Sequence, residues 1–183
     1  SELTYDGATH HYIAAIPGMK DRTILLHGVS KAFAMTGWRI GFACGPADII
    51  EAMMKIHQYS ILCAPIMGQE AAVEALERGA PSVIKMRDEY ERRRNFVVAA
   101  CRDMGLPCRM PQGAFYIFPN IAKYGMTSKE FALQFLQEKK VAVVPGTAFG
   151  ASGEGFVRCS YATSMEKLKI AMERLEEFLK EKK

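Results

Sequence analysis

The feature that most constrains this chain is an unbroken run from Ser30 to Gly41, S-K-A-F-A-M-T-G-W-R-I-G. It follows a short apolar segment, residues 23–27, that has the composition of a buried β-strand. A lysine directly after a strand, here Lys31, is placed to project its amine into a cleft. Arg39, eight positions later, can hold an anion beside that amine. An amine and a fixed cation on one loop suit a ligand that carries both an aldehyde and a phosphate group.

The run resembles the cofactor-lysine motif of the class I/II aminotransferases, which are fold-type I pyridoxal phosphate enzymes. The resemblance implies that Lys31 is the catalytic lysine, which holds the cofactor covalently, and that Arg39 binds the cofactor phosphate. Ser30 matches the serine beside the lysine and is expected to contribute to the same phosphate site. Some members have a further serine three positions before the lysine, where this chain has Gly28.

Each of these residues also has an ordinary structural interpretation. A lysine after a strand is commonly a solvated surface residue. An arginine beside a tryptophan, as Arg39 is beside Trp38, commonly forms a stacking pair. Thr36 and Gly37 are typical of a turn. The intact order of the residues therefore favours the cofactor interpretation, whereas no single residue does.

Two later segments resemble the same family. Residues 111–119, P-Q-G-A-F-Y-I-F-P, resemble its P-x-G-A-F-Y segment, whose turn faces the active site. Residues 144–150 and 156–161 resemble a P-G-x-x-F-G turn and a following strand that carries an arginine. In the family that arginine binds the substrate α-carboxylate, and Arg158 matches it. The alternative is an ion pair between Arg158 and a structural carboxylate, because a planar guanidinium meets both oxygens of any carboxylate.

Composition places the chain among ordinary globular proteins. Of its 183 residues 49% are hydrophobic and 24% charged, and 24 basic against 20 acidic residues give a net charge of +4. This small excess argues against nucleic-acid binding. No apolar run is long enough to span a membrane, and the N-terminus has no signal-peptide pattern. The five cysteines form no C-x-x-C pair, so we expect no disulfide framework, no metal site and a cytoplasmic location.

The apolar periodicity predicts an α/β chain. Strands are expected over 23–27, 39–44, 114–118, 141–144 and 155–160. Helices are expected over 49–59, 65–77, 81–102, 127–136 and from 164 towards the C-terminus. The first two strands have no evident partners, whereas the last three suggest a short antiparallel sheet covered by helices, an α+β unit. Arg92, Arg93 and Arg94 are assigned to the solvated face of the long helix, and the methionines of the earlier helices to the core.

The resemblance gives this pattern a domain assignment. Residues 1–62 are expected to hold the last strands of a large cofactor-binding domain and the start of a linking helix. Residues 63–183 are expected to form the small C-terminal domain, with the boundary near the helix break at Pro65. Family members contact the pyridine ring through residues before the lysine that cannot be assigned here. The chain is therefore expected to be the C-terminal part of a fold-type I aminotransferase.

The resemblance also implies a reaction. It predicts pyridoxal phosphate-dependent transamination between an amino acid and a 2-oxo acid, in an enzyme that is a homodimer at full length. Because one fold supports several chemistries, a pyridoxal phosphate-dependent β-lyase remains an open alternative. A second alternative is a fragment with no activity of its own, and the isolated chain is expected to be inactive. The sequence does not indicate which amino acid is the substrate.

Overall fold

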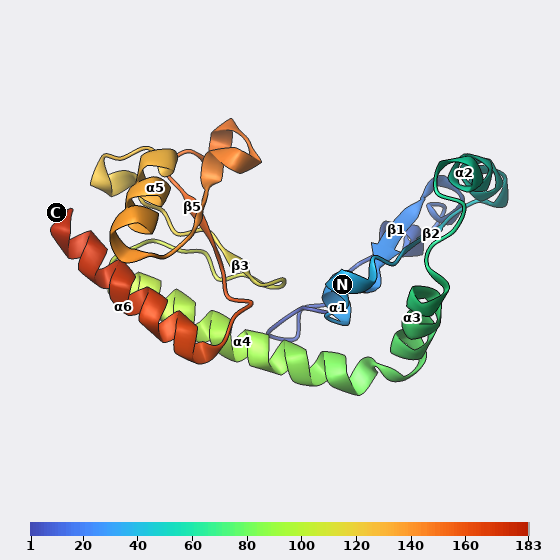
Figure 1. Cartoon of the computed structure of the whole chain (residues 1–183), viewed down its shortest axis with the longest axis horizontal. Coiled ribbons are helices and arrows are strands. Elements are labelled where there is room, and N and C mark those ends of the chain that lie inside the picture. The colour runs from blue at the N-terminus through green and yellow to red at the C-terminus, as the bar shows by residue number, and fades with distance from the viewer. Residues whose placement is uncertain (183) are drawn as a thin grey trace. The chain divides into compact units, whose positions relative to one another are not determined.

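The computed structural model describes residues 1–182 and divides the chain into two compact units, Ser1–Arg87 and Asp88–Lys183 (Figure 1). The division falls within the long helix α4 (Ala80–Asp103). It differs from the boundary predicted after residue 62, because helix α3 (Ile66–Arg78) belongs to the first unit. The physical reason is packing, since Ala72 of α3 shares a buried cluster with Val29 and Ile40.

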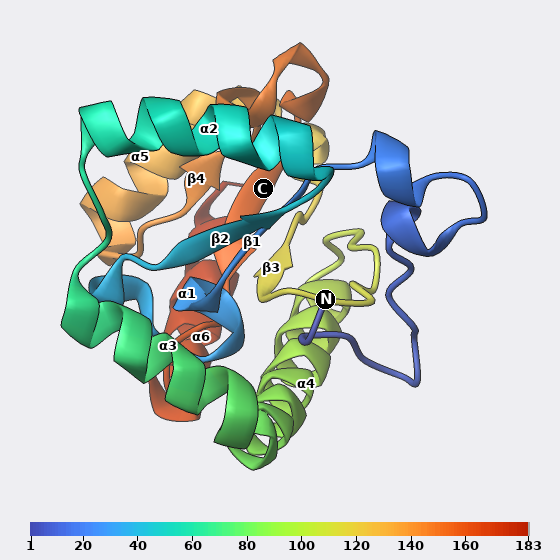
Figure 2. The same ribbon diagram turned by 90° about the vertical axis from the view of Figure 1, so that its right-hand side faces the viewer.

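A two-stranded antiparallel ribbon forms the centre of the first unit (Figure 2). Strand β1 (Leu25–Gly28) pairs with β2 (Gly41–Cys44), and Gly28 lies opposite Gly41. The expectation that these strands have no partners nearby is therefore wrong. They pair with each other because the connection between them folds back as the short helix α1 (Val29–Ala32) and the 3-10 turn η3 (Thr36–Trp38).

The remaining elements of the first unit are two 3-10 turns and a longer helix. The turns are η1 (Ile13–Ala15) and η2 (Lys20–Arg22), and the helix is α2 (Ala47–Ser60). Helix α2 has no buried residue, and its Met54 and Ile56 are 49% and 70% exposed. The assignment of the methionines of this helix to a core is wrong, because no element of the first unit covers its apolar residues completely.

The second unit contains the predicted short antiparallel sheet. Its strands are β3 (Tyr116–Ile117), β4 (Val144–Pro145) and β5 (Val157–Ser160), in the order β3-β5-β4. In the register, Tyr116 lies opposite Ser160 and Val144 lies opposite Arg158. Short 3-10 turns connect these elements: η4 (Ala122–Tyr124), η5 (Gly146–Phe149) and η6 (Ala151–Gly153). The predicted three-stranded sheet is thus observed, although each strand is shorter than expected and β4 overlaps the predicted range 141–144 only at Val144.

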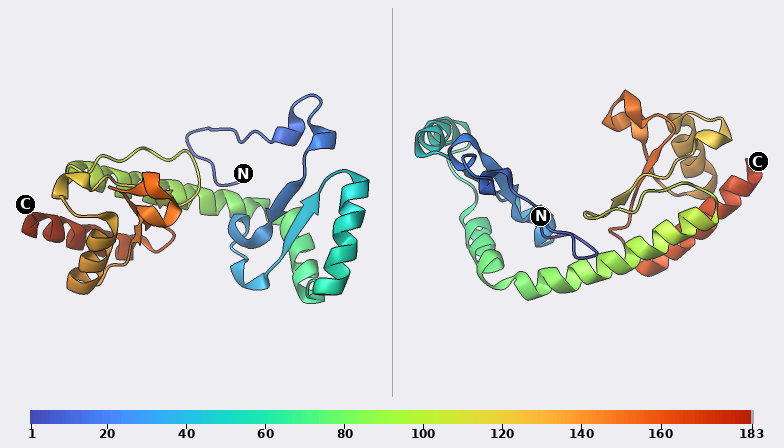
Figure 3. Two further views of the ribbon diagram at one scale, coloured as in Figure 1. Left: turned by 90° about the horizontal axis from the view of Figure 1, so that it is seen from above. Right: turned by 180° about the vertical axis from the view of Figure 1, so that it is seen from behind.

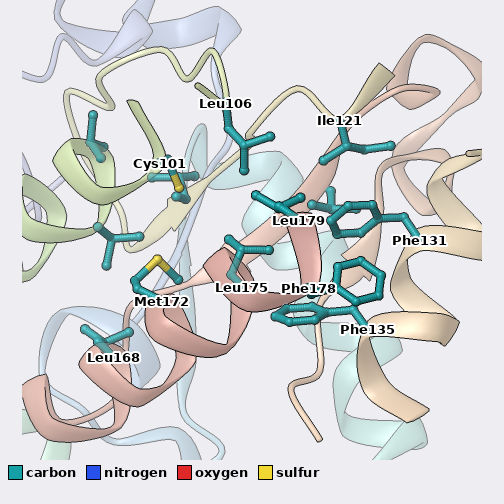
Figure 4. Close-up of a cluster of buried hydrophobic side chains, with 14 of the residues drawn as sticks. Cys101, Leu106, Ile121, Phe131, Phe135, Leu168, Met172, Leu175, Phe178 and Leu179 are labelled. Atoms are coloured by element: carbon teal, nitrogen blue, oxygen red, sulfur yellow. The ribbon is translucent and has the colours of Figure 1, made fainter. Parts of the chain in front are cut away.

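Helices cover this sheet and enclose the main core. Helix α5 (Ser128–Lys139) lies beside α6 (Met165–Glu181), and the later part of α4 runs alongside α6 in Figure 3. The rings of Phe131, Phe135 and Phe178 pack at centroid distances of 5.2 to 6.1 Å (Figure 4). Helical spacing accounts for the buried stripe of α6. That stripe consists of Leu168, Met172, Leu175, Phe178 and Leu179.

Arg94 of helix α4 is a buried cation, only 1% exposed. Its guanidinium donates hydrogen bonds to the Pro111 carbonyl oxygen (2.9 Å) and to Asn95 Oδ1 (2.8 Å), and it lies 3.4 Å from Glu91 Oε1. The prediction that Arg94 lies on the solvated face is therefore wrong. At helical spacing Arg94 falls on the same stripe as the buried Val97, Val98 and Cys101, which carries it inward.

Replacing Arg94 with methionine is expected to lower the free energy of unfolding by about 2–4 kcal/mol, because the Pro111 carbonyl loses its buried donor. The matched control is Arg92→Met, since Arg92 pairs with Glu89 on the exposed surface of the same helix. An exposed pair contributes at most about 1 kcal/mol. Urea unfolding of the three proteins checks this, and equal losses in both variants would contradict the buried role of Arg94.

Two carboxylates hold the N-terminus of α5, where the sequence predicted a helix start. Thr127 accepts a hydrogen bond from the Glu130 backbone N–H (3.2 Å), and the Glu130 carboxylate accepts one from the Thr127 N–H (2.9 Å), which completes a capping box. Glu154 accepts hydrogen bonds from the N–H groups of Ser128 (2.7 Å) and Gly155 (2.9 Å). The Ser128 and Gly155 N–H groups lower the pKa of Glu154.

Because the folded-state pKa of Glu154 is lowered, its stabilising effect is present above the ordinary value of 4.5 and is lost as the pH falls through the lower folded-state pKa. We therefore expect Glu154→Gln to be less stable than the natural chain at pH 7, and we expect this difference to shrink towards about pH 3. Urea unfolding at several pH values measures it. Glu173→Gln, at an exposed position of α6, is the control and should show no such trend.

Candidate functional site

The predicted cofactor residues lie on the connection between β1 and β2. Lys31 belongs to α1, and Arg39 directly follows η3. Because Gly28 and Gly41 face each other in the ribbon, this connection begins and ends at the same end of the two strands. A hydrogen bond from the Val29 N–H to the Ile40 carbonyl oxygen (3.3 Å) closes it further. The fold thus brings Ser30, Lys31 and Arg39 to one end of the ribbon.

Lys31 is exposed, and no carboxylate of residues 1–182 forms an ion pair with its amine. Ser30 is half-buried, and its hydroxyl makes no hydrogen bond to another described residue. At Gly28 an added Cβ would lie 3.0 Å from the Ile40 carbonyl oxygen and 3.3 Å from the Gly41 Cα. A serine there would therefore force the two strands apart slightly, which is a physical reason for glycine at this position.

Arg39 is exposed and adopts a left-handed backbone conformation, with φ of 57°. A residue other than glycine pays about 1–2 kcal/mol for this conformation, which is common at functional sites. Its Nη1 donates to the Thr36 carbonyl oxygen in the preceding turn (3.0 Å). Neither a carboxylate nor an aromatic ring of the described part of the chain contacts the guanidinium. The stacking alternative with Trp38 is therefore not observed, and the other guanidinium N–H groups remain available to an anion.

Arg158 lies in the second unit, half-buried on β5. Its guanidinium carbon lies 4.3 Å from the ring centroid of Tyr116 and 4.6 Å from that of Phe149. No carboxylate within residues 1–182 pairs with it, so the alternative of a structural ion pair is not observed. The neighbouring Cys159 is not a nucleophile, because burial raises the pKa of its thiol to about 12 and keeps it protonated at neutral pH.

Sequence reasoning did not identify the two rings around Arg158. Tyr116 ends the P-x-G-A-F-Y segment and Phe149 lies in the P-G-x-x-F-G turn, so both were present in the quoted motifs. Their approach to the arginine depends on the β3-β5-β4 strand order, which the residue pattern alone does not give. The available signal was that Tyr116, Phe149 and Arg158 all lie in motifs that resemble the same family. The sheet brings these three motifs together.

Two further properties of the described residues concern metal binding and membrane spanning. No group of three or more His, Cys, Asp or Glu side chains within residues 1–182 is arranged to hold a metal ion. Among the same residues, no helix combines the length and the apolar character needed to cross a bilayer.

A family model described as aminotransferase class I and II matches residues 3–175. The chain belongs to this family. The match includes the connection with Lys31 and Arg39 and the strand with Arg158. The family predicted from the three motifs is confirmed, and so is the fold class, because the similar solved structures are aminotransferases.

Individual aminotransferases show the same relationship. An aspartate aminotransferase of Pyrococcus abyssi is 54% identical over 98% of this chain, and aromatic-amino-acid aminotransferase 2 of Thermococcus litoralis is 52% identical over 99% of it. The crystal structure of an aromatic aminotransferase from Pyrococcus horikoshii matches 98% of the chain with a TM-score of 0.95 at 52% identity. The chain spans 46%, 47% and 48% of these three proteins, about half of each. This coverage fits the expectation that it corresponds to the C-terminal part of an aminotransferase.

Proposed function

We propose that this chain is the C-terminal part of a pyridoxal phosphate-dependent aminotransferase, which transfers an amino group from an amino acid to a 2-oxo acid. The observation that carries the proposal is the pair of exposed cations Lys31 and Arg39, which share one connection and have no carboxylate partner among the described residues. Two cations on one connection, with no carboxylate partner among the described residues, leave their N–H donors open to an anionic ligand such as a phosphate.

The residues on this connection fit the cofactor chemically. Lys31 offers a primary amine for the aldehyde group. Arg39 offers guanidinium N–H donors for the phosphate, and the Ser30 hydroxyl is a further donor beside them. Bound pyridoxal phosphate supplies an electron-withdrawing ring, which accepts the electron pair released when the Cα–H bond of the substrate breaks.

We assign proton transfer and substrate binding to two residues of this chain. The Lys31 amine, when neutral, takes the proton from the substrate Cα and later returns a proton, as general base and general acid. Arg158 holds the substrate α-carboxylate through two parallel N–H···O bonds, which fixes the direction of the Cα–H bond.

The remainder of the active site is proposed to come from outside these residues. Relatives about twice as long as this chain support a longer protein, in which other segments contact the cofactor ring. We further propose that the longer protein is a cytoplasmic homodimer and that the isolated chain is inactive. The similar relatives include one named for aspartate and one named for aromatic amino acids, at 54% and 52% identity. Similarity to these relatives therefore supports an amino acid and a 2-oxo acid as substrates, and it does not identify the side chain of the amino acid.

Product analysis tests the reaction. The longer protein is incubated with pyridoxal phosphate, a panel of amino acids, and either 2-oxoglutarate or no acceptor. Transamination predicts a new amino acid that forms only when the acceptor is present. A β-lyase would instead release pyruvate and ammonia without any acceptor, and that result would contradict the proposal.

A further inference from the structure

We propose that Tyr116 and Phe149 form an aromatic clamp that orients the Arg158 guanidinium for the substrate carboxylate. Both would be positioning residues, because they act through Arg158. The inference rests on the proposed function, which assigns the carboxylate to Arg158, and adds how that arginine is held ready for it.

Two short distances between the Arg158 guanidinium and aromatic rings define the clamp. The guanidinium carbon lies 4.3 Å and 4.6 Å from the two ring centroids, both well within the 6 Å range of a cation–π contact. The rings come from different segments, Tyr116 from β3 and Phe149 from η5. Neither ring contact is a hydrogen bond, and no described residue accepts one from Arg158, so its N–H donors are available for a bidentate bond to a carboxylate.

Each ring also contacts a second aromatic residue, and Phe149 is 51% exposed. Phe149 packs edge-on against Phe118 at 5.6 Å, and Tyr116 lies opposite Ser160 in the sheet, with Phe115 at 4.6 Å. The turn before β3 is fixed from two sides. The Tyr161 hydroxyl donates to the Ala114 carbonyl oxygen (3.0 Å), and Arg94 donates to that of Pro111.

A held arginine has a physical advantage over a mobile one. A long side chain loses rotamer freedom when it binds, and this loss weakens binding. A carboxylate partner can order an arginine through bidentate hydrogen bonds, but it would also compete with the substrate carboxylate for the same donors. Arg158 has no carboxylate partner among the described residues. Two rings can restrict the guanidinium without occupying its N–H donors, so the site combines order with an open binding edge.

The test removes each ring in the longer protein loaded with pyridoxal phosphate. The variants are Phe149→Leu and Tyr116→Leu, and the ring-keeping variants Phe149→Tyr and Tyr116→Phe are their matched controls. The probe is 2-oxo acid binding, measured by calorimetry with whichever of pyruvate, 2-oxoglutarate and phenylpyruvate binds most tightly. Each leucine variant should raise the dissociation constant about 5- to 30-fold, with a smaller change in kcat than in KM. The ring-keeping variants should recover most of that binding. Equal binding in the leucine and ring-keeping variants would overturn the clamp.

A double-mutant cycle separates positioning from structural damage. When Arg158 is already alanine, Phe149→Leu should cause little further loss of kcat/KM, because the ring has no guanidinium left to orient. An equal loss with and without Arg158 would overturn the clamp and leave the proposed function intact. If Arg158→Ala alone leaves 2-oxo acid binding unchanged, the assignment of the substrate carboxylate to Arg158 fails, and the clamp fails with it.

Discussion

Replacing Lys31 with alanine is expected to lower turnover of the longer protein by at least about 10³-fold, because we propose that this one amine both holds the cofactor and moves the substrate proton. The structure supports a reactive role for this lysine. It is exposed, has no ion-pair partner among the described residues, and lies on the same β1–β2 connection as Arg39. Replacing a solvated surface lysine that has no catalytic role would not lower turnover by this factor.

The matched control for this experiment is Lys20→Ala, since Lys20 is also exposed and lies in the same unit, in η2. Initial rates are measured with saturating cofactor, and circular dichroism verifies that both variants are folded. Lys20→Ala should behave like the natural protein. Near-normal turnover by the Lys31 variant would contradict the catalytic assignment.

Replacing Arg158 with alanine is expected to lower kcat/KM by about 10²- to 10³-fold, because the substrate carboxylate loses a bidentate, charge-assisted partner in a partly desolvated site. The cofactor should still bind, since Arg158 is assigned to the substrate and Arg39 to the phosphate. Arg158→Lys keeps the charge but lacks the planar fork, so an intermediate loss is expected.

Arg102→Ala is a suitable control for Arg158, because Arg102 is an exposed arginine of the same unit. Steady-state kinetics give kcat/KM, and a titration with pyridoxal phosphate gives cofactor affinity. If Arg158→Ala weakened cofactor binding and left the KM of the amino acid unchanged, the role of this residue would have to be reassigned.

Local sequence signals predicted the second unit well. Short apolar runs indicated β3, β4 and β5, and the helix start predicted at Thr127 is where a capping box with Glu130 begins α5. These features depend on residues close in sequence, so a single chain reveals them. The structure places Lys31 and Arg39 on one connection, whereas the strand predicted over 39–44 had included Arg39.

Features that depend on tertiary context were predicted less well. Arg94 points inward because it lies on the buried stripe of α4 and donates to the Pro111 carbonyl oxygen. The sequence did not predict this, because nothing local distinguishes Arg94 from the adjacent Arg92 and Arg93. The apolar residues of α2 were predicted to lie in the core, but they are exposed. Helical periodicity shows which face of a helix is apolar, and it does not show whether another element covers that face. The rings near Arg158 required the strand order.

The central claim is that Lys31 holds the cofactor, and borohydride trapping tests it most directly. The longer protein is incubated with pyridoxal phosphate, reduced with borohydride, digested and analysed by mass spectrometry, with Lys31→Ala treated in parallel. The account predicts a stable cofactor adduct on the peptide that contains Lys31, and none at this position in the variant. An adduct on another lysine with Lys31 unmodified, or no adduct at all, would contradict it.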